Sequence, residues 1–410
     1  MRGPDAFPTV AGVAAAARML TLRHPDLCRM RLAGESRSGQ PLWLLSVGAP
    51  RGCDRHVLVV AGANCDEPAG CGAALWLAEQ AVHDRRRLKA AGLTWDFLLC
   101  LDPDGALLNE RGPAGRRPPA VHFRHTYRPA GTEHPHAADS LLAPVGGLPE
   151  TLALSALVAE LRPVLSCSLH GTDVGGAWVR LSAEVPGLAE PFGKSAAELD
   201  IPVQAGTYEA LASRGAGPGL FVTPAAGQRY GGTEVRVEVP MWATRRVAYA
   251  EPHPDPEYAL AVLAARLRNE GATGEEAFGQ ALELLGDAAD GPLLRAARHA
   301  VGAWAAIAAD FDAVGRDASL PLTMAHVAAC DIAARRAPLR AAGMLLRLLD
   351  EARLDEDPDS GPARLRARLE RRLDAGAADL IAAMDAVWVP IPEQMELQAR
   401  TVLAAAARIG

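Results

Sequence analysis

Three polar residues follow short apolar runs in the N-terminal half of the chain, and their types could bind a metal ion. Asn64 and Glu67 lie in a polar turn directly after the apolar run at 56–61. His170 follows the apolar run at 164–169. Amide, carboxylate and imidazole groups all serve as ligands for divalent metal ions. Taken singly, a polar turn or a histidine at a strand end is more often structural, so the three gain weight only together.

Glu238 is the carboxylate that is hardest to explain as a structural residue. It stands between Val237 and Val239 in an apolar run that ends at Pro240. Burying a carboxylate costs several kcal/mol unless another group pairs with it. Neighbouring side chains of a strand point to opposite faces, so Glu238 should face away from both valines. Glu238 is therefore a candidate general base, and a structural carboxylate paired with an arginine such as Arg236 or Arg246 is the alternative.

Apolar runs separated by helical stretches make up residues 1 to about 252 and must position these side chains. The pattern predicts strands at 42–47, 56–61, 95–101, 164–169 and 234–239, a turn at 102–105, and helices at 70–90 and 148–161. Strands that alternate with helices indicate an α/β fold with a mixed central sheet. Segments 110–148 and 206–232 show no clear periodicity, and the second could cover a substrate.

The composition changes at about residue 253, within a stiff, proline-rich linker at 251–256. Helix-period spacing of apolar residues predicts helices at 257–270, 274–286, 290–315, 322–353, 361–387 and 392–408. We therefore expect a catalytic α/β domain at 1–252 and an all-α domain at 253–410. The helical domain could pack against the first domain or form a homodimer.

The composition also limits the partners. Of the 410 residues, 49% are hydrophobic and 22% are charged, which is typical of a folded globular protein. A net charge of −7 gives no support for a nucleic-acid partner. We see no uncharged apolar run of about 18 residues and no convincing signal peptide, so we expect no membrane partner. The cysteines form no CxxC pair and favour a reducing compartment, so the expected location is the cytoplasm.

Six short motifs occur in the order found in the M14 metallocarboxypeptidase family, and residues 30 to about 245 resemble that family. The motifs are GESRSGQPL (34–42), NCDEPAG (64–70), DPDG (102–105), PET (149–151), SLHG (168–171) and VEVP (237–240). Each motif is weak alone, but six in the right order are specific. The most similar branch of the family has HPNEPxG and SLHNxxxGG at the second and fifth motifs.

The resemblance implies one Zn²⁺ ion bound by Asn64, Glu67 and His170, with water in the open position and Glu238 as the base. Zinc lowers the pKa of its bound water and polarises the scissile carbonyl. The family has a histidine where this chain has Asn64, and an amide oxygen is a weaker zinc ligand. Three interpretations stay open: weakened zinc binding, preference for another divalent ion or side chain, and a metal-free descendant that only binds its ligand.

Other side chains could replace Asn64 as a ligand. Cys65 should project away from the direction of Asn64 because neighbouring residues alternate in extended backbone. His122, His125, His134 and His136 crowd the irregular segment, where an exposed histidine-bearing loop is the simpler interpretation. Asn64 is therefore preferred.

The resemblance also implies arginines for the substrate's terminal carboxylate and for the oxyanion. The candidates are Arg116, Arg117, Arg124 and Arg128. Arg124 and Arg128 are favoured because HFRHTYRP (122–129) resembles the family's YRP, and surface arginines are the alternative. Further candidates for substrate contact are Arg117, Asp173, Tyr208, Glu209, Arg229 and Tyr230.

The expected function is a metal-dependent hydrolase with a specialised biosynthetic or processing role. It would remove a C-terminal amino acid, or cleave a similar amide bond, from a small peptide-like substrate. Two alternatives stay open. One is a catalytically inactive M14 fold that binds a peptide or partner protein, and the other is an amidase or deacylase that acts on a non-peptide metabolite.

Overall fold

The computed structural model describes residues 6–48, 55–84, 92–135, 147–210, 214–223, 232–286, 291–317, 322–352, 357 and 359–409. A mixed sheet runs through its N-terminal part in the order β1-β2-β4-β3-β5-β9-β6-β8-β7, and β10 pairs with β9. The strands are β1 (Cys28–Glu35), β2 (Pro41–Val47), β3 (His56–Val60), β4 (Thr94–Leu98), β5 (Leu165–Gly175), β6 (Trp178–Leu181), β7 (Arg214–Gly217), β8 (Leu220–Val222), β9 (Thr233–Ala243) and β10 (Val387–Trp388). The predicted α/β fold with a mixed central sheet is confirmed.

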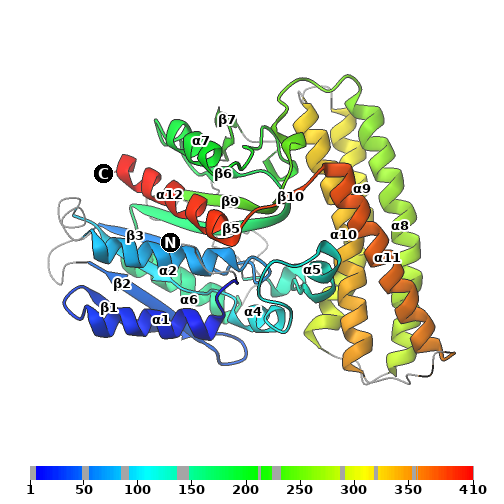
Figure 1. Ribbon diagram of the computed structural model, residues 1–410, viewed down its shortest axis with the longest axis horizontal. Helices are drawn as coiled ribbons and strands as arrows, with labels where there is room; N and C mark the ends of the chain where they lie inside the picture. Colours follow the sequence, from blue (N-terminus) through cyan, green and yellow to red (C-terminus); the bar gives the residue numbers. More distant parts are fainter. Residues whose placement is uncertain are drawn as a thin grey trace.

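Helices cover both faces of the sheet (Figure 1). One face packs against α1 (Val10–Arg23), α2 (Ala69–His83), α7 (Ala189–Glu198) and α12 (Ile391–Ile409). The other face packs against α6 (Pro149–Leu161). The alternation within β3 shows how the sequence builds both layers: Val57 and Val59 belong to the first core and Leu58 to the second. A strand buried on both faces reads as a continuous apolar run, which is why β3 was predictable.

Two strands extend beyond their predicted ends. β5 continues past His170 to Gly175, and β9 continues past Pro240 to Ala243. The prediction that β9 stops at Pro240 was therefore wrong. Its partner β6 pairs with β9 only as far as Glu238, and β10 begins to pair at Trp242. Pro240 lies between these two pairings, where the missing N–H costs no ladder bond on that side.

The stretch that follows β4 contains more helix than the sequence predicted. The predicted turn at 102–105 is the start of α4 (Pro103–Asn109), and the Asp102 side chain caps it by accepting from Gly105 N. The segment predicted to be irregular contains α5 (Pro119–His125). A helix of 7 residues is too short to show a periodicity. The described residues also contain three short 3₁₀ helices: η1 (Gly131–Glu133), η2 (Tyr208–Ala210) and η3 (Arg245–Ala248).

The predicted helical region is confirmed as a bundle beside the sheet (Figure 1). Its helices are α8 (Pro256–Leu285), α9 (Pro292–Arg316), α10 (Met324–Glu351) and α11 (Gly361–Met384). The two helices predicted at 257–270 and 274–286 are the single helix α8. A Cβ at Gly274 would lie 2.1 Å from the Trp304 ring of α9, so this glycine permits the close approach of α8 and α9. No helix of the described residues is long and apolar enough to cross a membrane.

The chain returns to the sheet after the bundle. α12 lies against the sheet, as Figure 1 shows, and its Leu397 and Val402 are buried in the sheet's core. The sequence had grouped 392–408 with the bundle. The predicted linker is tied to the start of α10, because Met324 N donates to Glu251 O (2.9 Å) and His253 N to Leu322 O (3.0 Å). The division at residue 252 stays a prediction.

Candidate active site

Asn64, Glu67 and His170 form one buried cluster at an edge of the sheet. The loop after β3 carries Asn64 and Glu67, and the adjacent parallel strand β5 carries His170. Asn64 Nδ2 lies 2.5 Å from Glu67 Oε1 and 3.2 Å from His170 Nδ1. Glu67 Oε2 lies 2.9 Å from His170 Nδ1. The structure therefore brings together the three side chains that were predicted to bind a metal ion.

The imidazole of His170 is held in a fixed orientation. Ser168 Oγ lies 2.5 Å from Nε2, so Nδ1 is the nitrogen that faces Glu67 and Asn64. Burial lowers the pKa of His170 to about 3, so the ring is neutral at pH 7. Gln398 on α12 donates to the backbone oxygen of His170 (2.7 Å). A neutral ring held by outer contacts is what a metal-binding histidine needs.

The donor set fits a divalent metal ion with one weak ligand. A neutral imidazole and a carboxylate are ordinary zinc ligands. The oxygen and nitrogen of an amide are assigned from their neighbours, and turning the Asn64 amide over would place Oδ1 beside Glu67 and His170 Nδ1. In that orientation three acceptors would face one another, and a cation bound among them would satisfy all three. The described residues contain no metal-binding group of three or more His, Cys, Asp or Glu side chains, so Asn64 would have to be the third ligand.

Glu67 itself is an incompletely compensated carboxyl group. Burial, followed by the nearby charge of Asp66, raises its pKa to about 7. Arg128 Nη1 lies 3.7 Å from Glu67 Oε1 and only partly offsets this penalty. A bound cation would favour the ionised form and complete the compensation.

A cavity of about 240 Å³ opens beside the cluster, between the sheet edge and α10. Small-molecule pockets usually measure roughly 300–1,000 Å³, so this cavity suits a small substrate. Its charged lining residues are Glu67, Glu209, Glu238, Arg128, Arg236, Arg336 and Arg340. Carboxylates and arginines therefore face the same enclosed space.

Glu238 faces this cavity, as the alternation of β9 predicted. Val237 and Val239 are buried in the core on the other side of the strand, and Glu238 lies in register with His170 of β5. Its Oε1 accepts from Arg236 Nε (2.6 Å) and lies 2.5 Å from Arg236 Nη2. Burial raises the pKa of Glu238 to about 7, although Arg236 acts in the opposite direction. The candidate base Glu238 therefore has a pKa near neutrality and one carboxylate oxygen held by an arginine.

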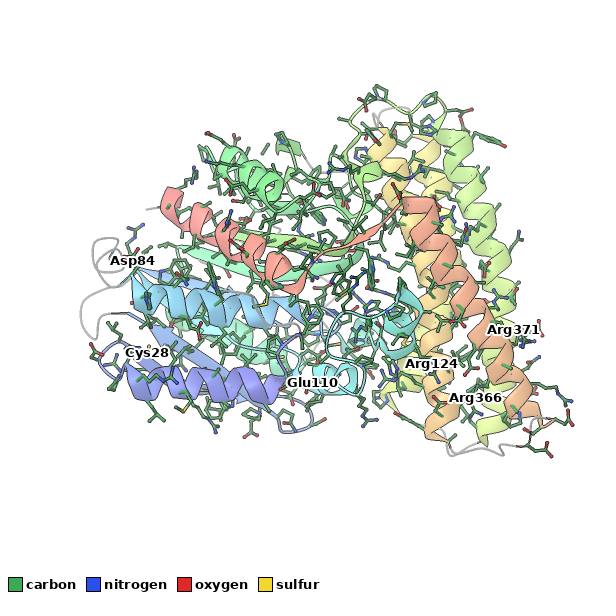
Figure 2. The ribbon with its side chains drawn as sticks, in the orientation of Figure 1. Cys28, Asp84, Glu110, Arg124, Arg366 and Arg371 are labelled. Atoms are coloured by element: carbon green, nitrogen blue, oxygen red, sulfur yellow. The ribbon has the colours of Figure 1, made fainter. Side chains whose placement is uncertain are left out.

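The favoured arginines lie in different places. Arg128 lines the cavity and pairs with Asp66 (3.2 Å). Arg124 is not a lining residue, because it pairs with Asp350 on α10. Figure 2 shows Arg124 beside the bundle, near Arg366, which pairs with the same carboxylate. The structure thus brings Arg128 to the site and leaves Arg124 at the contact between α5 and the bundle.

The predicted substrate contacts are also divided. Tyr208 and Glu209 line the cavity, and Tyr208 OH donates to Asp310 of α9 (2.7 Å). Arg117 does not line it, and its Nη1 donates to Pro113 O (2.7 Å). Asp173 is buried behind the cavity wall, where it accepts from Arg340. Tyr230, Arg229 and His136 lie outside the described residues.

The alternative metal ligands do not join the cluster. Cys65 Sγ donates to Tyr127 O at 3.5 Å, which agrees with the expected alternation between Asn64 and Cys65. His122 is fully buried, and its Nε2 lies 2.7 Å from Asp173 Oδ1. His125 and His134 are not among the lining residues. Asn64 remains the preferred third ligand.

The sequence did not predict two of the cavity arginines, Arg336 and Arg340. Arg236 was considered as a structural partner of Glu238, and it shares the face of Glu238 because it lies two residues before it on one strand. Arg336 and Arg340 are one helical turn apart on α10 and also share a face. They carried no signal, since an arginine among alanines and leucines reads as part of a solvated helix face.

Three of the family-like motifs meet each other away from the cavity. Ser36 Oγ donates to Asp104 Oδ1 (2.6 Å), which joins the first motif to the DPDG motif. Arg37 N and Nε donate to Glu150 Oε1 at 3.0 and 3.2 Å, which joins it to the PET motif. None of these residues lines the cavity. In this chain the three motifs therefore connect the turn after β1 to the first turns of α4 and α6.

The chain is similar to known proteins over part of its length. Residues 13–175 match the Peptidase_M14 family model, described as zinc carboxypeptidase. No curated protein matches the chain. Carboxypeptidase A from Helicoverpa armigera is 14% identical with a TM-score of 0.39, over 58% of this chain and 65% of that one. A metallo-carboxypeptidase from Burkholderia cenocepacia is 16% identical with a TM-score of 0.38, over 57% of this chain and 60% of that one.

The alignments span less than two thirds of either solved structure. The resemblance to a known family therefore rests on the match of residues 13–175 and on the order of the motifs. Over these residues, which make up less than half of the chain, the protein is similar to the M14 zinc carboxypeptidase family.

Proposed function

We propose that the protein is a metal-dependent hydrolase of the carboxypeptidase type. It removes a C-terminal amino acid, or cleaves a similar amide bond, from a small peptide-like substrate. The observation that supports this most is the convergence of Asn64, Glu67 and His170 beside a cavity that also contains Glu238. The match of residues 13–175 to the M14 family model supports a metal-dependent hydrolase in general.

Asn64, Glu67 and His170 would hold the metal ion. A bound Zn²⁺ would supply a Lewis acid and lower the pKa of a water molecule. Two of the three ligands would be oxygens, so a harder divalent ion is the alternative to zinc. Ser168 and Gln398 keep the His170 ring and backbone in place for this task.

Glu238 would take the proton from the attacking water and pass it to the leaving amine. A pKa near 7 leaves a substantial ionised fraction at neutral pH and still permits the group to return the proton. Arg236 holds Oε1, which orients the carboxyl group within the cavity. The chemistry that this chain contributes is therefore proton transfer from a fixed position.

Arg336 is the cavity arginine best suited to a substrate carboxylate. Its Nη1 donates to Thr172 Oγ1 (3.2 Å), and its Nε lies 3.9 Å from Asp173. Arg236 and Arg340, by contrast, each have a carboxylate oxygen within 3 Å, at 2.5 and 2.7 Å respectively. The guanidinium group of Arg336 is therefore less engaged with carboxylates than those of Arg236 and Arg340, and an arginine can bind a carboxylate in two-point geometry. This contact would select substrates with a free terminal carboxylate.

Two features support the alternative of an inactive M14 fold that binds a peptide. Asn64 stands where the family has a histidine, and Arg236 engages the proposed base. An amidase or deacylase would use the same residues on a non-peptide substrate. A measurement of metal content distinguishes the hydrolase from the peptide-binding protein. Assays on peptide and non-peptide amides distinguish the peptidase from the amidase.

The test uses the full chain purified without chelator. Its metal content is measured, and it is assayed on N-acyl amino acids and dipeptides, on their C-terminal amides, and on non-peptide amides. The proposal predicts about one metal ion per chain and turnover that requires both the free carboxylate and Glu67. Metal-free protein that binds a peptide without turnover in added zinc would contradict it. Turnover of non-peptide amides alone would replace the peptidase with an amidase.

A further inference from the structure

We infer that Arg340 of α10 is a positioning residue that holds together the two chain segments carrying the candidate metal ligands. Its Nη2 donates to Asp66 Oδ2 (3.1 Å) and to Asp173 Oδ2 (2.7 Å). Its Nε donates to the same Asp173 oxygen (3.1 Å). One guanidinium group therefore joins two carboxylates from different parts of the sheet.

The two carboxylates are adjacent to the candidate ligands. Asp66 directly precedes Glu67 in the loop after β3, and Asp173 lies three residues after His170 on β5. Any displacement of either carboxylate would move the backbone that carries a ligand. Arg340 does not need to contact the metal ion, because it would act through the two segments that carry the candidate ligands.

The charges show why this position needs a cation. Asp66 and Asp173 are both buried, with exposed fractions of 4% and 2%. Burial penalises the charge of Asp66, and the guanidinium groups of Arg128 and Arg340, at 3.2 and 3.1 Å, offset this penalty. Removing one partner from a buried ion pair leaves an uncompensated charge. Loss of Arg340 would leave Asp66 with Arg128 and Asp173 with His122 and Arg336. No cation would then join the two carboxylates to each other, so the segments should move apart.

The fold fixes Arg340 where this contact requires it. A Cβ at Gly343 would lie 1.8 Å from Phe123 O, so α10 packs backbone to backbone against α5 at this glycine. Gly343 is within one turn of Arg340, and tight packing there sets the position of the arginine along the cavity. The bundle is therefore a structural part of the site, although it lies outside the segment that matches the family model.

The first test compares Arg340→Gln with Arg335→Gln in the metal-free full chain by hydrogen exchange. Arg335 is on the same helix but pairs with Asp331 and Asp379, away from the cavity, so it is a matched control. Amide exchange at 62–68 and 170–176 should rise in Arg340→Gln and stay at the wild-type level in Arg335→Gln. Unchanged exchange at both segments in folded Arg340→Gln protein would overturn the inference. Arg340→Lys, which retains the charge but not the fork, replaces it if Arg340→Gln does not fold.

The second test measures zinc affinity by competition with a chromophoric chelator, and this arm rests on the proposed function. Arg340→Gln should weaken zinc binding roughly 10- to 100-fold, as loss of an outer contact to a metal site does. Adding Asp173→Asn removes one of the two opposed carboxylates and should restore part of the affinity. A purely structural role would lower the melting temperature and leave zinc affinity unchanged well below it. Wild-type protein that binds no zinc would contradict the proposed function, while the exchange comparison still decides the role of Arg340.

Discussion

The two walls of the cavity carry different chemistry and differ in how far the sequence reveals them. The sheet wall carries the candidate ligand Glu67 and the candidate base Glu238, and His170 contacts Glu67. The α10 wall carries Arg336 and Arg340. Glu67, His170 and Glu238 lie in motifs that resemble the M14 family, although only Glu67 and His170 fall within the matched segment, and the two arginines lie outside both. The resemblance therefore accounts for the candidate ligands and base but not for the arginines of α10.

The largest expected effect is on the sheet wall. Glu238→Gln should lower kcat by roughly 10²–10⁴-fold, because it removes the basicity of the proposed general base and retains its shape. The Gln oxygen can still accept from Arg236, so metal content should change little. Steady-state kinetics, metal analysis and a melting curve on one preparation check this. A folded variant with full activity would show that Glu238 is not the general base.

The next effect is on the α10 wall. Arg336→Gln should raise KM for substrates with a free carboxylate roughly 10- to 100-fold, the value of a hydrogen bond between charged groups. Because the arginine would contact the substrate away from the scissile bond, kcat should change less than KM. The C-terminal amides serve as the internal control and should be unaffected. An equal rise in KM for the acids and for their C-terminal amides would show that Arg336 does not bind the substrate carboxylate.

The part of the fold that could be predicted follows from local patterns. β3 was predictable because its valines and leucines are buried on both faces, and the bundle helices because their apolar spacing is long and regular. α5 was not predicted because it is too short to show a periodicity. The full length of β9 was not predicted because a proline such as Pro240 normally ends a strand. The return of α12 to the sheet depends on tertiary packing that no local pattern records.

The candidate site divides in the same way. Asn64, Glu67, His170 and Glu238 were found because they occur in ordered motifs, and the structure brings the first three into contact. Arg336 was not found, because its role depends on how α10 docks against the sheet. Arg124 was favoured on a local resemblance to YRP, but its position in α5 directs it to the bundle.

A smaller effect concerns the stability of the fold at acid pH. It involves His122, whose Nε2 lies 2.7 Å from Asp173 Oδ1. Burial lowers the pKa of His122 below 6.5, although Asp173 opposes this and Arg117 and Arg340 add to it. Below about pH 6.5 the unfolded chain therefore binds a proton that the folded chain does not, so stability falls as the pH falls. One such group contributes at most about 1.4 kcal/mol per pH unit. Urea unfolding at several pH values should show a shallower slope between about pH 7 and 5 for His122→Phe, and an identical slope would contradict this account.

The central claim is that Asn64, Glu67 and His170 form a metal site weakened by its amide ligand. The most direct measurement is zinc affinity, by chelator competition, for the wild-type chain and for Asn64→His. Because imidazole is the stronger zinc ligand, Asn64→His should bind zinc more tightly by roughly 1–3 kcal/mol. Glu67→Gln in the same assay should bind more weakly than the wild-type chain. Equal affinity in the wild-type and Asn64→His proteins would show that Asn64 is not a ligand and would contradict the account.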